Sequence, residues 1–140
     1  MFVAIEAAAS SLAKSCTDAQ LSLAVVISDS GAAANIVSKF RPNVPVIVVT
    51  SQPNIAAQAC LTFGQKGYLV PERDFNMGGS ASGALGRKGG LLVQKAVEWA
   101  IEQGILVKVD GVAARVACMT GYSSADTATD SNAVVSVVEI

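Results

Sequence analysis

The sequence contains no histidine, and charged residues make up only 15% of its 140 residues. The absence of histidine removes the commonest general base and the commonest metal ligand from the candidate chemistry.

The net charge is −1, and the longest basic run is the pair Arg87-Lys88. Nucleic-acid binding needs a stripe of Lys and Arg that displaces counterions from the phosphates. We therefore expect no nucleic-acid partner.

Long apolar runs are missing as well. A helix needs about 20 consecutive apolar residues to span a membrane, and no stretch of this chain reaches that length. The first fifteen residues lack the basic segment that precedes the apolar stretch of a signal peptide. From these features we expect no membrane partner and no signal peptide.

Cysteines are few, odd in number and widely spaced, at Cys16, Cys60 and Cys118. This pattern is typical of reduced thiols in the core of a cytosolic protein rather than of disulfides or a zinc site. We expect a cytoplasmic location and no metal bound by this chain.

Apolar residues are abundant, at 51% of the sequence, with a surplus of Ala and Val. Two buried sheet faces would use this surplus, and so would an oligomer interface. A chain of this length most often forms one domain, since domains usually run about 100–150 residues. We expect residues 1–140 to form one unit.

Hydrophobic periodicity predicts helices that alternate with strands. The expected helices span residues 2–15, 32–40, 53–63 and 91–103, and the expected strands span 21–27, 45–50, 67–70, 112–119 and 133–140. Residues 71–90 contain six glycines and little periodicity, which predicts a flexible loop or insertion. Alternation predicts a three-layer α/β/α fold with a mostly parallel sheet. The last strand follows its predecessor without a helix, so we expect it to be an antiparallel edge strand.

A Ser-Asp-Ser-Gly turn, Ser28 to Gly31, separates the first expected strand from its helix. Turns and helix N-termini at this point of a βαβ unit are where ligands bind. Ser and Asp are also good N-cap residues, so the turn has a purely structural interpretation too. Neither the GxGxxG nor the GxxxxGK[ST] nucleotide-binding motif follows the strand.

The segment SKFRPNVPVIVVT contains Arg41-Pro42, then Pro45, and an apolar strand that ends in Val49-Thr50. This pattern resembles the C-terminal domain of pyruvate kinase. Further resemblance lies in the Ser-Gly turn upstream and in the segments 53–71, 102–111 and 132–140. It covers nearly the whole chain except residues 71–90, and it suggests that the first helix of the domain is truncated here.

The resemblance implies a five-stranded α/β domain that sits beside a catalytic barrel and sister subunits in a homotetramer. The parent enzyme, a cytoplasmic transferase of glycolysis, moves phosphate from phosphoenolpyruvate to ADP to give pyruvate and ATP, with magnesium and potassium. The barrel holds the active site, so we expect this chain to carry regulation and subunit assembly, with no catalytic residues and no cofactor of its own. The alternative is a free-standing, non-enzymatic domain of the same fold that binds a small phosphorylated ligand.

Family members that respond to sugar phosphates bind the effector at the turn after the first strand. The candidate effector-binding residues that the resemblance implies are Ser28, Asp29, Ser30, Gly31, Ala32, Ala33, Arg87, Lys88, Gly121, Tyr122 and Ser123. Asp29 places a negative charge in the turn, which opposes a phosphate. We expect Arg87 and Lys88, in a flexible loop, to fold over the turn when a ligand binds, or else to be ordinary solvated charges.

Two features indicate packing against other parts of the molecule or its partners. The apolar last strand would expose an edge that invites pairing with a second chain. Trp99 lies in the middle of an expected helix, where we predict a helix–core or helix–subunit contact.

Overall fold

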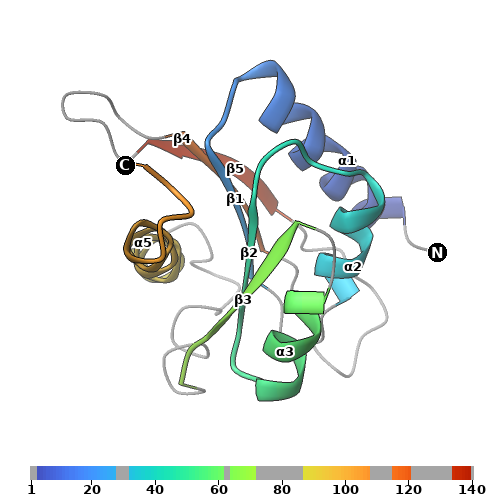
Figure 1. Ribbon diagram of the computed structural model, residues 1–140. Coiled ribbons are helices and arrows are strands. Elements are labelled where there is room, and N and C mark those ends of the chain that lie inside the picture. The colour runs from blue at the N-terminus through green and yellow to red at the C-terminus, as the bar shows by residue number, and fades with distance from the viewer. Residues whose placement is uncertain are drawn as a thin grey trace.

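The computed structural model describes residues 3–27, 32–61, 64–71, 87–107, 115–120 and 134–139. Figure 1 shows helices and strands alternating along most of the chain. The helices are α1 (Val3–Asp18), α2 (Ala32–Lys39), α3 (Pro53–Leu61) and α5 (Arg87–Glu102), and the strands are β1 (Leu23–Ile27), β2 (Val46–Thr50), β3 (Gln65–Leu69), β4 (Arg115–Thr120) and β5 (Val134–Glu139). No described helix is long and apolar enough to cross a bilayer.

The strands form one five-stranded sheet in the order β3-β2-β1-β4-β5. Parallel pairing joins β3 to β2, β2 to β1, and β1 to β4, whereas β5 pairs with β4 in the antiparallel direction. The predicted α/β fold, with its antiparallel edge strand, is confirmed.

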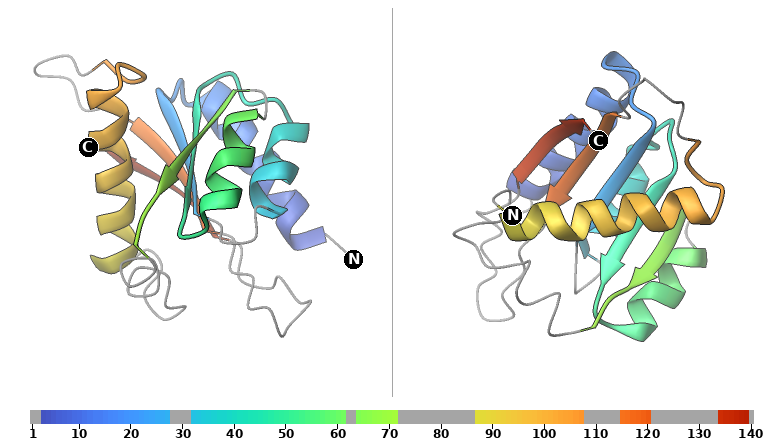
Figure 2. Two further views of the ribbon diagram at one scale, coloured as in Figure 1. Left: turned by 60° about the horizontal axis from the view of Figure 1, so that its bottom comes forward. Right: turned by 90° about the vertical axis from the view of Figure 1, so that its left-hand side faces the viewer.

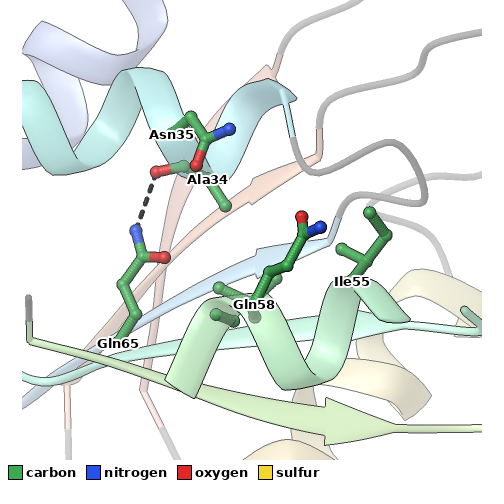
Figure 3. Close-up of a pocket in the computed structure, with 7 residues that line it drawn as sticks. Ala34, Asn35, Ile55, Gln58 and Gln65 are labelled. Atoms are coloured by element: carbon green, nitrogen blue, oxygen red, sulfur yellow. Dashed lines mark hydrogen bonds between the residues drawn. The ribbon is translucent and has the colours of Figure 1, made fainter. Parts of the chain in front are cut away.

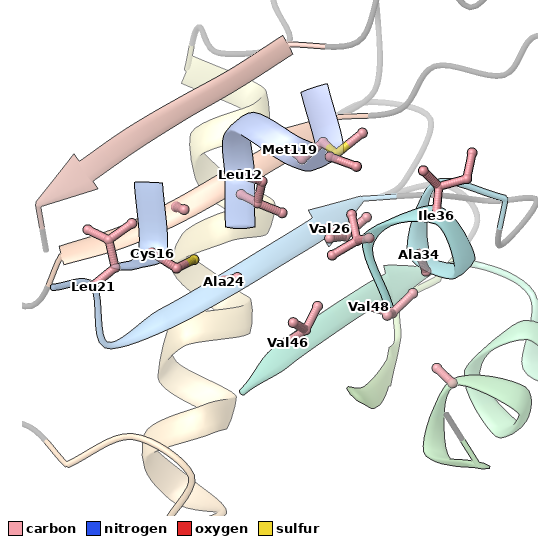
Figure 4. Close-up of a cluster of buried hydrophobic side chains, with 14 residues drawn as sticks. Leu12, Cys16, Leu21, Ala24, Val26, Ala34, Ile36, Val46, Val48 and Met119 are labelled. Atoms are coloured by element: carbon pink, nitrogen blue, oxygen red, sulfur yellow. The ribbon is translucent and has the colours of Figure 1, made fainter. Parts of the chain in front are cut away.

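Helices cover both faces of the sheet, which gives the expected three layers (Figure 2). On one face α1, α2 and α3 contribute Leu12, Val37 and Ala59 to a core with Ala24 and Val26 of β1 (Figure 4). On the other face, α5 packs its Val93, Ala96, Val97 and Ala100 over the alternate residues of the same strands. β1 and β2 are buried along their full length, because each lies inside the sheet between two helical layers.

The start of α5 differs from the sequence prediction. Arg87, Lys88, Gly89 and Gly90 belong to its first turn rather than to the flexible loop expected over residues 71–90. Glycine is a weak helix former, but the apolar stripe that packs on the sheet stabilises the helix as a whole. Pro71 precedes the remainder of the expected loop, and residues 72–86 lie outside the described residues.

The end of α5 follows the prediction closely. Gly104 has a φ of 73°, a left-handed conformation that glycine adopts without a side-chain penalty. The N–H of Gly104 donates to the carbonyl of Ile101 at 3.1 Å, and the N–H of Ile105 donates to the carbonyl of Ala100 at 2.9 Å. These bonds satisfy carbonyls that the helix end would leave unpaired.

Trp99 makes a contact within the chain. Its ring stacks on Tyr68 of β3 with centroids 5.1 Å apart and an interplanar angle of 22°. Both side chains are half-buried against the core beneath α5. The predicted contact between this helix and the core is therefore present.

The three cysteines are free thiols, as predicted, but they occupy different environments. Cys16 and Cys118 are buried, and burial raises the pKa of the Cys16 thiol above its ordinary value. Cys60 is exposed near the end of α3, so the expectation that it lies in the core is wrong. The reason is that α3 buries little of its surface, with Ala59 as its buried residue.

This difference predicts the reactivity of the thiols. A thiol-reactive dye should label Cys60 rapidly in the native protein and reach Cys16 and Cys118 only after unfolding, because both access and thiolate formation control the rate. Labelling followed by mass spectrometry measures this, with Cys60→Ser as the control that should remove the rapid phase. Equal labelling rates at all three positions in the native protein would contradict the burial of Cys16 and Cys118.

Candidate functional site

The candidate site lies where the order of the strands reverses. From β1 the chain proceeds through β2 and β3 on one side, then returns through α5 to β4 on the other side of β1. In open α/β sheets, ligands bind outside the carboxyl ends of the strands at such a switch point. Here that point is the end of β1 and β4, where Ile27 is paired with Thr120.

This pairing places two of the sequence-predicted segments at neighbouring strand ends. The turn from Ser28 to Gly31 follows Ile27 directly, and the segment from Gly121 to Ser123 follows Thr120 directly. Both segments lie outside the described residues, so the structure fixes only the points from which they leave the sheet.

Ala32 and Ala33 form the beginning of α2, just after that turn. The first N–H groups of a helix have no partner inside the helix, and they carry the positive end of the helix dipole. An anion beside the end of β1 would therefore meet backbone donors. A helix N-terminus with these properties suits phosphates and carboxylates.

Arg87 and Lys88 begin α5, which lies in the layer opposite to α2. The right-hand view of Figure 2 shows the N-terminal end of α5 near the carboxyl end of β4. The expectation that these two residues lie in a flexible loop is wrong, since they belong to a helix. That they fold over the turn when a ligand binds stays a prediction.

The end of β2 shows how the sheet edge is completed next to the switch point. Thr50 is fully buried, and its Oγ1 accepts a hydrogen bond from the N–H of Gln52 at 3.1 Å. The carbonyl of Gln52 then accepts from the N–H of Ala56 at 3.1 Å, which begins α3. The Thr50 hydroxyl therefore has a structural role in the transition from strand to helix.

A polar feature that the sequence analysis missed lies between α2 and α3. Gln65, the first residue of β3, is only 3% exposed, and its Nε2 donates to the carbonyl of Ala34 at 2.7 Å. A small cavity of about 10 Å³ adjoins its side chain, with Asn35 and Gln58 in its wall (Figure 3). No local pattern signals this contact, because the two residues are 31 positions apart in the sequence.

Metal ligands do not gather in the part of the chain that the structure describes. No group of three His, Cys, Asp or Glu side chains is placed to hold an ion there. The described edge offers the backbone N–H groups at the start of α2.

Comparison with known proteins identifies the domain. The family model described as pyruvate kinase, alpha/beta domain, matches residues 6–134. This chain belongs to the pyruvate kinase alpha/beta domain family. No curated protein matches the sequence significantly.

The pyruvate kinase fold is also evident among solved structures. Pyruvate kinase from Cryptosporidium parvum, solved in complex with ADP, superposes with a TM-score of 0.70 at 21% sequence identity. The match covers 96% of this chain but 23% of that one. The chain therefore spans about a quarter of the pyruvate kinase that it resembles, and at this identity the likeness shows the fold alone.

Proposed function

We propose that this chain is the regulatory and subunit-assembly domain of a pyruvate kinase. The observation that carries the proposal is the switch point, where α2 begins just beyond the paired ends of β1 and β4. In the proposed parent enzyme a separate barrel, with magnesium and potassium, transfers phosphate from phosphoenolpyruvate to ADP. This chain contributes no catalytic residue to that reaction.

In the proposed regulatory role, a sugar phosphate binds at the turn from Ser28 to Gly31. Hydroxyl groups and the N–H groups at the start of α2 act as donors, and the segment from Gly121 to Ser123 follows the neighbouring strand β4 in the sequence. Among the candidate residues, the two cations are Arg87 and Lys88, which begin α5 in the opposite layer. The support for this role is the pairing of Ile27 with Thr120, since the two segments leave the sheet from these neighbouring strand ends.

Asp29 sets the expected strength of binding. A unit charge at about 4 Å from another contributes roughly 4 kcal/mol at an effective dielectric constant of about 20. The helix dipole contributes only about 0.3–1 kcal/mol in the opposite direction. We therefore propose weak binding that favours a monophosphate over a bisphosphate.

Calorimetric titration of sugar monophosphates and bisphosphates into the folded chain tests the regulatory role. Asp29→Asn should strengthen binding at least about fivefold, since removing a like charge is worth about 1 kcal/mol even in bulk water. Asp18→Asn is the matched control, because Asp18 is exposed at the end of α1 and pairs with Lys14 at 3.4 Å, at the other edge of the sheet. If no sugar phosphate gives heat at millimolar concentration with either protein, the regulatory role is wrong.

The proposed assembly role is supported by the position of β5. It is an edge strand paired on one side with β4, and such an edge offers unpaired backbone groups to another chain. We expect the isolated chain to form dimers as its concentration rises, and sedimentation velocity measures this. A monomer at the highest attainable concentration would contradict assembly through this domain alone.

A further inference from the structure

The strongest remaining feature is the side-chain amide of Gln65 in the cavity between α2 and α3. Its Nε2 lies 2.7 Å from the carbonyl oxygen of Ala34. If the amide were flipped, Oε1 of Gln65 would face the carbonyl oxygen of Ala34, and both atoms are acceptors. The hydrogen bond therefore assigns the nitrogen of the amide to the side that faces Ala34. The oxygen, Oε1, must then point away from Ala34 and toward the cavity (Figure 3).

This oxygen is buried and has no hydrogen-bond partner within the described part of the chain. Buried acceptors in native proteins are nearly always paired, with protein donors or with ordered water. The apolar neighbours Val48 and Ala59 cannot donate. No described residue donates to this oxygen, so a water molecule in the cavity is the donor that the geometry favours.

The cavity has the size and chemistry for one such donor. Its volume is about 10 Å³, and a single water needs roughly 10–15 Å³ measured in this way. A buried water also needs two to four polar partners. Asn35 on α2 and Gln58 on α3 place amide groups in the wall, in addition to Gln65 Oε1. Figure 3 shows these side chains reaching the cavity from three different elements.

We propose that this cavity binds one ordered water molecule that donates to Gln65 Oε1 and bridges to the side chains of Asn35 and Gln58. The water completes a polar link between the start of β3, α2 and α3. Because Gln65 also holds the Ala34 carbonyl, the link fixes α2 relative to the sheet. An apolar ligand would leave Gln65 Oε1 without a donor.

A crystal structure of the 140-residue chain at high resolution tests the proposal directly. We expect density for a water within about 3.2 Å of Gln65 Oε1 and of an amide group of Asn35 or Gln58. In solution, magnetisation transfer between water and the Gln65 side-chain amide protons should reveal a water that stays longer than surface water. Absence of the density, or a protein donor on Oε1 in its place, would overturn the proposal.

Two variants make the test specific. Gln65→Met has a similar length but no amide oxygen, so it should lose the ordered water. Gln52→Met is the matched control, because Gln52 is exposed and does not line the cavity, and this variant should keep the water. An ordered water that remains in Gln65→Met would contradict the role of Oε1. If Gln65→Met does not fold, the crystal structure and the solution measurement on the unmodified chain still decide the question.

Discussion

Gly67→Ala should destabilise the protein more strongly than its single added methyl group suggests. A Cβ atom at Gly67 would clash with the carbonyl oxygen of Ala56, and it would lie 2.7 Å from the carbonyl carbon and 2.8 Å from the Cα of that residue. These are backbone atoms of α3, so no side chain can turn aside to make room. Relief requires α3 to move away from β3.

We expect the free energy of unfolding of Gly67→Ala to fall by about 3 kcal/mol, in the upper part of the usual range for overpacking. For a domain of this size such a loss lowers Tm by roughly 10 °C. Thermal and denaturant unfolding of the variant beside the unmodified chain measure both quantities.

Gly64→Ala and Gly104→Ala are matched controls for the same change. A Cβ at either position meets nothing within 4 Å, but each residue has a φ of 73°. The expected loss is about 1 kcal/mol, from placing a side chain in a left-handed conformation. If Gly67→Ala loses no more stability than these two variants, the close approach of α3 to β3 is wrong.

The central strands could be predicted because their local signals agree with their place in the sheet. β1 and β2 are short apolar runs rich in β-branched residues, and the Arg41-Pro42 pair ends the helix between them. Arg41 has a φ of 48°, a left-handed conformation that terminates α2 just before the proline. The sequence pattern predicts no helix between the last two strands, and from this the antiparallel edge position of β5 could be predicted.

The elements that were predicted less well depend on distant contacts. β3 begins at Gln65 rather than at Gly67, because it pairs with β2 from Val46 onward. α5 begins at Arg87 because packing on the sheet outweighs the poor helix propensity of Gly89 and Gly90. Local propensity carries no information on either contact.

The same distinction applies to the candidate site. Carboxyl ends of parallel strands share one edge, so the sequence could predict that the first and fourth strands end side by side, as Ile27 and Thr120 do. The position of Arg87 and Lys88 depended on where α5 begins and could not be predicted. The hydrogen bond from Gln65 to Ala34 joins residues with no shared motif, and only the tertiary fold brings them together.

Gln65→Glu should make the stability of the protein strongly dependent on pH. A neutral carboxyl group can imitate the amide, since its O–H donates to the Ala34 carbonyl while its other oxygen faces the cavity. An ionised carboxylate is an acceptor only, and it would face the Ala34 carbonyl oxygen without a donor. Burial and this lost hydrogen bond both favour the neutral form, so the pKa of the new Glu side chain should rise above its ordinary value of about 4.3.

Because folding raises the pKa of this carboxyl group, the direction in which stability changes with pH can be derived. A group whose pKa is raised by folding binds more protons in the folded state, so stability falls as the pH rises from the unfolded pKa to the folded pKa. Below about pH 4 the variant should approach the stability of the unmodified chain at the same pH. Near pH 7 we expect a deficit of about 3 kcal/mol or more, as for other buried charges that lose their partner.

Denaturant unfolding from about pH 4 to pH 8 measures this difference across the range in which a raised carboxyl pKa would act. Gln94→Glu is the matched control, because Gln94 is exposed on α5 and its change of charge should leave the pH dependence almost unaltered. Gln65→Met removes the amide without adding a charge, so its deficit should be independent of pH. A deficit in Gln65→Glu that does not change with pH would show that the Ala34 carbonyl does not depend on a donor from this side chain. A loss of stability that appears only as the pH rises would show that a hydrogen bond donated from the side chain at position 65 to the Ala34 carbonyl stabilises the fold.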